Sequence, residues 1–122
     1  MEQLDPATLL YLHAQLVARL GGPPGVRDVV ALQAALAAAD SPEDGLFERA
    51  AHIAIGLVAA RPFHAANEAL AVAAAVLWLR RHGLAIALEP AEMPAVATHL
   101  ARRDAKALAG WLRARAQPLD VA

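Results

Sequence analysis

The sequence predicts an all-α fold, a compact bundle of about six helices around a central buried helix. Of the 122 residues, 58% are hydrophobic, and many of these are alanine, which favours helix. Apolar residues recur at helical spacing in segments that Gly and Pro separate. The segment 70–79 is apolar nearly all round, as expected for a helix covered by its neighbours. A chain of this length is expected to form one domain, residues 1–122, with one core.

The first two helices are predicted from their boundaries. Asp5 is a candidate N-cap with Pro6 at the first helical position, and Gly21–Gly22 end the helix. Asp28 is placed to cap a short second helix, which we expect to run to about Ala39.

The third and fourth helices flank a proline. Ser41–Asp44 has capping-box spacing with Pro42 at the first helical position, so a third helix should start there and run towards Ala60. Pro62 breaks that helix. A fourth helix, the expected centre of the bundle, starts near residues 65–66 and ends at Gly83.

The C-terminal third predicts two further helices. Leu84–Leu88 alternates weakly and is interpreted as a short extended segment. Pro90 opens a fifth helix, in which Pro94 fits only within the first turn. Asp104 caps a sixth helix, which ends before Pro118.

Composition limits the classes of function. A formal net charge of −1 argues against a nucleic-acid-binding protein, which would carry a basic face. The absence of cysteine excludes disulfides and thiolate metal sites. Residues 1–5 lack the regions of a signal peptide, and Ala69–Leu79 is too short to span a bilayer. We therefore expect a cytoplasmic protein without nucleic-acid or membrane partners.

The strongest functional signal is the segment Arg61-Pro62-Phe63-His64-Ala65-Ala66-Asn67-Glu68-Ala69. It resembles the active-site loop of the Doc (death on curing) branch of the Fic/Doc family, which reads H-x-F-x-D-[A/G]-N-[K/G]-R. Segments 21–28, 46–51 and 77–84 also look like Doc-type chains, so the resemblance covers most of the sequence, from about residue 10 to residue 112. It implies a helical Fic/Doc fold and an ancestral transfer of phosphate or nucleotide groups onto protein hydroxyls.

The sequence keeps some positions of the family's motif, here called the frame, and has other residues at the positions that react. The frame positions are Phe63, Ala66 and Asn67, and we expect Phe63 to anchor the loop in the core and Asn67 to orient its backbone. The family's base, metal-binding Asp, cation and Arg fall respectively at Arg61, Ala65, Glu68 and Ala69.

These replacements predict the loss of the family's chemistry. A guanidinium does not accept a proton, so Arg61 is no base. Ala65 offers no metal ligand and Ala69 no charge, so we expect neither metal nor cofactor. Glu68 repels an incoming phosphate, and we expect it to face Arg61 across the emptied site.

Three functional hypotheses follow. The first is a Doc-like protein of the toxin–antitoxin kind that has lost catalysis and binds an antitoxin, a target protein or a second copy through a groove beside the motif. The second is an active phosphotransferase or AMP transferase that uses ATP and magnesium, with His64 as a displaced base, on a protein such as elongation factor Tu. The third is a structural or oligomerisation module, favoured if Trp78 or Trp111 is exposed. The histidines outside the motif are interpreted as surface or packing residues: His13, His52, His82 and His99.

Overall fold

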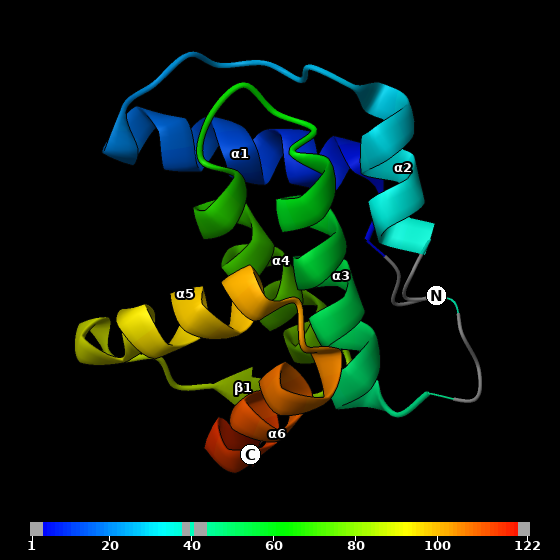
Figure 1. Cartoon of the computed structure of the whole chain (residues 1–122), viewed down its shortest axis with the longest axis vertical. Coiled ribbons are helices and arrows are strands. Elements are labelled where there is room, and N and C mark those ends of the chain that lie inside the picture. Colours follow the sequence, from blue (N-terminus) through cyan, green and yellow to red (C-terminus); the bar gives the residue numbers. More distant parts are fainter. Residues whose placement is uncertain (1–3, 38–39, 41–43, 120–122) are drawn as a thin grey trace.

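The fold is predominantly helical, as the sequence predicts (Figure 1). The computed structural model describes residues 4–37, 40 and 44–119. The elements are α1 (Pro6–Leu20), α2 (Val29–Ala37), α3 (Leu46–Ala60), α4 (Asn67–Arg81), β1 (Leu84–Ile86), η2 (Pro90–Glu92), α5 (Met93–Arg102), α6 (Ala105–Arg115) and β2 (Ala116–Pro118). Within these described residues, no helix combines the length and the apolar character needed to cross a bilayer.

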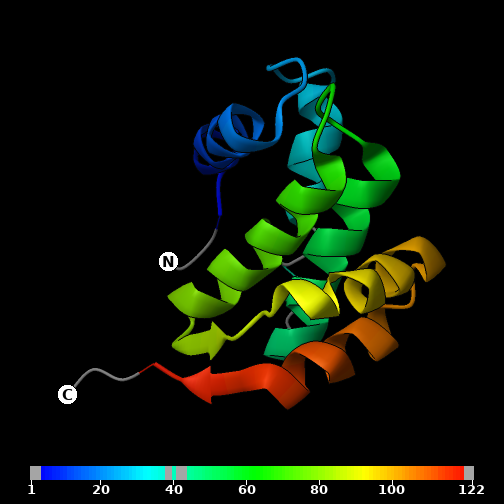
Figure 2. The same cartoon turned by 90° about the vertical axis from the view of Figure 1, so that its left-hand side faces the viewer.

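Helices α3 and α4 form the centre of the bundle. They pack side by side, with α1 and α2 at one end and α5 and α6 at the other (Figures 1 and 2). Leu70, Trp78 and Leu79 of α4 are buried, which confirms the predicted central helix. Val76 and Leu77 remain partly exposed, so α4 is covered on most of its surface but not all round.

Three aspartates cap helices as predicted. The Asp5 carboxylate accepts a hydrogen bond from the Thr8 N–H at 2.8 Å. Asp28 at the start of α2 accepts a hydrogen bond from the Ala31 N–H at 3.0 Å, and Asp104 at the start of α6 accepts one from the Ala107 N–H at 3.0 Å. Each bond satisfies a backbone donor that has no partner within its helix.

The predicted start of the third helix is wrong. Helix α3 begins at Leu46, with Gly45 in an extended conformation as its N-cap. Glu48 lies in the first turn, and a Cβ atom on Gly45 would be only 2.7 Å from its Oε1 atom. An acidic side chain in the first turn stabilises the helix start without a capping box. The predicted capping residues 41–43, and the end of the second helix at 38–39, lie outside the described residues.

A small antiparallel sheet closes the C-terminal end. Strand β1 confirms the first part of the predicted extended segment, and it pairs with β2 in the register Ile86 with Ala116. Strand β2 follows α6 directly and is not predicted by its sequence, Ala-Gln-Pro, which has low β-propensity. Its conformation depends on pairing with a distant segment.

Candidate functional site

The motif residues form the connection from α3 to α4, and both of its ends have left-handed backbone. Arg61 is the C-cap of α3 with φ 47°, and Ala66 is the N-cap of α4 with φ 61°. Such conformations cost about 1–2 kcal/mol for residues with a Cβ atom. They persist only where surrounding contacts fix them.

The first of these contacts is a reciprocal pair of hydrogen bonds between Asn67 and Phe63. The Phe63 N–H donates to Asn67 Oδ1 at 3.1 Å, and Asn67 Nδ2 donates to the Phe63 carbonyl at 2.9 Å. Both residues are 1% exposed. The buried amide therefore closes the loop on itself, which confirms the expected roles of these two frame residues.

The second contact comes from His13 on α1. Its ring stacks on Phe63 with centroids 4.0 Å apart and an interplanar angle of 17°. Its Nε2 lies 2.8 Å from the Ala65 carbonyl oxygen, so this nitrogen carries the proton that is donated. His13 is 2% exposed. Sequence reasoning gave it no specific role, although its position four residues after the buried Leu9 places both on the inner face of α1.

The segment before α2 supplies the third contact. Val26 pairs with Phe63 in an isolated antiparallel bridge. The N–H groups of Arg27 and Asp28 both donate to the Pro62 carbonyl, at 2.6 and 3.0 Å. The glycine-rich turn and the motif loop thus form a two-layered unit at one end of the bundle; in Figure 1 the connection from α1 to α2 runs along the top, next to the loop between α3 and α4.

The Arg27 side chain completes this unit. Its Nε donates to the Arg61 carbonyl at 3.0 Å, and its Nη2 donates to the Ala60 carbonyl at 3.1 Å. These carbonyls end α3 and lack partners within the helix, and the negative end of the helix dipole also favours a cation there. Arg27 therefore holds the C-terminus of α3 beside the motif.

Two glycines allow the close approach of these segments. Gly22 has φ 105°, and a Cβ atom there would lie 3.0 Å from Ala65 Cβ. Gly25 has φ 102°, and its carbonyl accepts the His64 N–H at 3.4 Å. A side chain at either position would be strained.

The replaced reactive positions surround this rigid backbone. Arg61, His64 and Glu68 are exposed, whereas Ala65 and Ala69 are partly buried. The sequence predicts that Arg61 and Glu68 face each other, but among the described residues the two side chains make no ion pair. Both charges stay in water, where such a pair would contribute only ~0–1 kcal/mol.

The arrangement limits what the site can do chemically. Within the described part of the chain, no three His, Asp or Glu side chains gather closely enough to hold a metal ion. Helix α4 starts without a side-chain cap, so its first N–H groups have no side-chain acceptor there. An anion could approach these groups, but the exposed Glu68 carboxylate opposes it.

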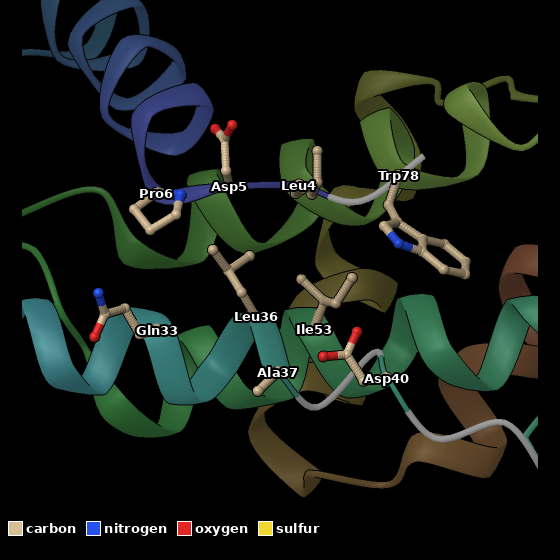
Figure 3. Close-up of a pocket in the computed structure, with 9 residues that line it drawn as sticks. All are labelled: Leu4, Asp5, Pro6, Gln33, Leu36, Ala37, Asp40, Ile53 and Trp78. Carbon is tan, nitrogen blue, oxygen red and sulfur yellow. The ribbon is translucent and has the colours of Figure 1, made fainter. Parts of the chain in front are cut away.

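A cavity lies away from the motif (Figure 3). It has a volume of about 310 Å³ and is lined by Leu4, Asp5, Pro6, Gln33, Leu36, Ala37, Asp40, Ile53 and Trp78. Trp78 belongs to the C-terminal half of α4, whereas the motif ends in the first turn of that helix. This cavity is therefore not the groove expected beside the motif.

No protein-family model matches the sequence, and a search of curated proteins also gives no match. The functional inference therefore depends on the contacts of the motif loop. The structure brings Phe63 and Asn67 together, and His13, Arg27 and the two glycines contact the same loop.

Proposed function

We propose that the protein is a Doc-like scaffold that has lost the family's transfer reaction and acts by binding another protein. The observation that carries the proposal is the intact loop frame, in which Asn67 and Phe63 exchange two buried hydrogen bonds. This frame is built without any of the reactive side chains that it would otherwise position. Selection for a binding surface accounts for a maintained loop geometry without catalytic groups.

The side chains at the reactive positions support the loss of transfer. Arg61 stands at the position of the base, and removing a general base alone typically lowers the rate by ~10²–10⁴. Ala65 and Ala69 remove the metal ligand and a cation. Glu68 adds a negative charge at the helix end where the phosphates would bind, so it opposes binding as well as chemistry.

The same loop is suited to protein recognition. Arg61, His64 and Glu68 project from a backbone that buried residues hold rigid, so little entropy is lost when a partner binds. A partner with an acidic group opposite Arg61 and a basic group opposite Glu68 would fit the pattern. A helical antitoxin segment or the ancestral target protein would be such a partner in a toxin–antitoxin context.

The position of His64 supports an alternative function, that of an active enzyme. His64 is an exposed imidazole whose backbone is tied to Gly25 at the entrance to α4. In that alternative, His64 is the base of an active phosphotransferase or AMP transferase that uses ATP and magnesium.

Label transfer distinguishes the two functions. The protein is incubated with magnesium and ATP labelled at the γ-phosphate or in the adenosine, together with elongation factor Tu or whole-cell protein. The proposal predicts no label on any protein above a blank without the chain. Transfer that His64→Ala abolishes would establish the alternative instead.

Charge reversal tests the binding surface. The first candidate partner is the product of an adjacent gene, since antitoxins are encoded beside their toxins in the family that the motif resembles. The double variant Arg61→Glu with Glu68→Arg should lower the affinity at least tenfold, because each partner charge then meets its own sign. Lys106→Glu on α6 is the matched control and should leave the affinity unchanged. Equal affinity of all three proteins would reject the loop as the binding surface.

A further inference from the structure

The cavity away from the motif combines an apolar inner wall with polar residues that are exposed (Figure 3). The inner wall contains Leu4, Ile53 and Trp78, which are 8%, 0% and 1% exposed. Asp5 and Asp40 also line the cavity, and both are exposed. Apolar walls with a few polar groups are typical of sites for small molecules, and a volume of about 310 Å³ is at the lower end of their range.

Trp78 brings a hydrogen-bond donor without an acceptor to this inner wall. In Figure 3 the nitrogen edge of its indole ring is turned towards Leu4 and Ile53. Among the described residues, no group accepts a hydrogen bond from Trp78 Nε1. Every fully enclosed side-chain nitrogen or oxygen in that part of the chain has a partner, so this nitrogen is open to a molecule in the cavity. A buried tryptophan N–H usually finds an acceptor, and here a ligand can supply it.

Two neighbours hold the indole ring in this orientation. The centroid of the His82 ring lies 4.0 Å from that of Trp78, and His82 Nδ1 lies 2.8 Å from the Trp78 carbonyl oxygen. The Arg49 guanidinium lies over the indole, 5.2 Å from its centroid. A donor that is already held in place loses little freedom when it binds an acceptor.

We propose that this cavity binds a small uncharged molecule that has an apolar body and an oxygen atom as the acceptor for Trp78 Nε1. The apolar body displaces water from the walls that Leu4, Leu36 and Ile53 form, which favours binding. The proposal does not rest on the proposed function, because the cavity is separate from the motif loop.

The carboxylates beside the cavity oppose an anionic ligand. Asp5 and Asp40 are among its described lining residues, and no Lys or Arg is among them. The hydrogen bond from the Thr8 N–H, first among several causes, lowers the pKa of Asp5, so this carboxyl stays ionised at neutral pH. Arg81 also lowers the pKa of Asp5, but it does not line the cavity. A ligand that carries a carboxylate or a phosphate therefore meets charges of its own sign.

The indole N–H signals in a nitrogen–proton correlation spectrum of the full chain test the contact. The chain has two tryptophans, and Trp111→Phe assigns the two signals. Benzyl alcohol, which combines an apolar ring with a hydroxyl oxygen, should move the Trp78 signal downfield and leave the Trp111 signal in place. The shift should saturate with a dissociation constant of about millimolar or tighter. A Trp78 signal that does not move at the solubility limit of the alcohol overturns the proposal.

Three related ligands test the chemical class. Toluene and protonated benzylamine offer no acceptor to the indole, so they should bind at least about threefold more weakly and cause no downfield shift. Benzoate should bind at least about tenfold more weakly than the alcohol, because its carboxylate meets those of Asp5 and Asp40. Binding of benzoate or benzylamine as tight as that of benzyl alcohol contradicts the proposed class.

Two variants of α2 test the location. Leu36→Phe enlarges a side chain that lines the cavity, so it should weaken the binding of benzyl alcohol at least about tenfold. Val30→Phe on the same helix, where the side chain is 74% exposed and outside the lining, is the matched control and should bind like the parent. Circular dichroism checks that both variants fold. Equal affinities of the two variants would show that the alcohol binds elsewhere.

Trp78→Phe tests the hydrogen bond itself. The variant keeps an apolar wall but has no N–H, so benzyl alcohol and toluene should bind to it with equal affinity in calorimetric titrations. A preference for the alcohol that is as large as in the parent would show that Trp78 Nε1 is not the donor.

Discussion

The ring of His13 stacks on the ring of Phe63, with their centroids 4.0 Å apart, and so ties helix α1 to the connection between α3 and α4. The same histidine holds the Ala65 carbonyl at 2.8 Å. One buried side chain thus fixes two points of the motif loop. Rigidity of the loop depends on α1 as well as on the residues of the motif.

Removal of His13 should therefore destabilise the fold. His13→Ala leaves the partly buried Ala65 carbonyl without its donor and uncovers Phe63, so the free energy of unfolding should fall by about 1–3 kcal/mol. Urea denaturation followed by circular dichroism measures this change. The matched control is His64→Ala, which changes an exposed histidine in the same unit and should stay within ~0.5 kcal/mol of the parent. Equal effects of the two substitutions would contradict the role of His13.

Asn67 should tolerate neither removal nor a charge. Asn67→Ala leaves both backbone groups of Phe63 unpaired in a buried site, which should cost about 1–3 kcal/mol of stability. Asn67→Asp keeps the acceptor but loses the donor and buries a carboxylate, so it should be at least as destabilising at neutral pH. Thermal unfolding of both variants beside Glu68→Ala measures the difference. A neutral Asn67→Asp would show that the amide donor is dispensable.

Ala66 should gain from replacement by glycine. The left-handed backbone of Ala66 costs about 1–2 kcal/mol of stability because the residue has a Cβ atom. Glycine removes this cost, but its greater freedom in the unfolded chain lowers the stability by about 0.4–1 kcal/mol. We expect Ala66→Gly to be neutral or to raise the melting temperature slightly. Ala74→Gly, in the buried middle of α4, is the contrasting control and should lower it. A strong loss of stability in Ala66→Gly would show that the left-handed conformation is not the native one.

Acid should lower the stability of the protein through a small set of carboxylates. The pKa of Glu92 is lowered mainly by the hydrogen bond from the Arg115 side chain. The pKa of Glu48 is lowered mainly by a hydrogen bond from the backbone N–H of Glu48 itself. The pKa of Asp5 is lowered by the Thr8 N–H. As the pH falls through the carboxyl range, the unfolded chain therefore binds more protons than the folded chain does. The stabilisation from these three groups is fully present above their unfolded-state pKa values and is lost as the pH falls through their lower folded-state pKa values.

Glu92→Gln checks the sign. The variant should lose less stability than the parent between neutral and acid pH, because one of the shifted groups no longer titrates. Urea midpoints measured across this range give the comparison. A parent whose stability rises as the pH falls would contradict the direction of all three shifts.

The helices were predictable because their signals are local. Asp5, Asp28 and Asp104 each bond an N–H three residues ahead, and such contacts are written into adjacent sequence. Strand β2 was not predictable, because Ala116–Pro118 becomes extended only by pairing with β1. The start of α3 was misplaced because a capping-box pattern at 41–44 competes with an acidic first turn at Glu48.

The candidate site divides in the same way. The roles of Phe63 and Asn67 could be predicted from the motif, since they act within four residues of each other. The role of His13 depends on the packing of α1 against a loop 52 positions further along the chain, where no local pattern reaches. The expected pairing of Arg61 with Glu68 failed because opposite charges in water gain too little to fix two exposed side chains.

The most direct test of the central claim, an intact backbone frame without its chemistry, is calorimetric titration of ATP with magnesium. The parent chain should give no binding heat. The quadruple variant Arg61→His, Ala65→Asp, Glu68→Lys and Ala69→Arg should bind, because the first turn of α4 and the Phe63–Asn67 frame remain in place. Glu68→Lys alone should give the largest single gain, since it reverses a charge beside the phosphates, and neighbouring changes should not add independently.

Circular dichroism provides the folding control for this titration, since both proteins must show the same helical signal. Binding by the quadruple variant and not by the parent is the predicted result. Equal failure of two folded proteins to bind ATP, or equally tight binding by both, would contradict the account.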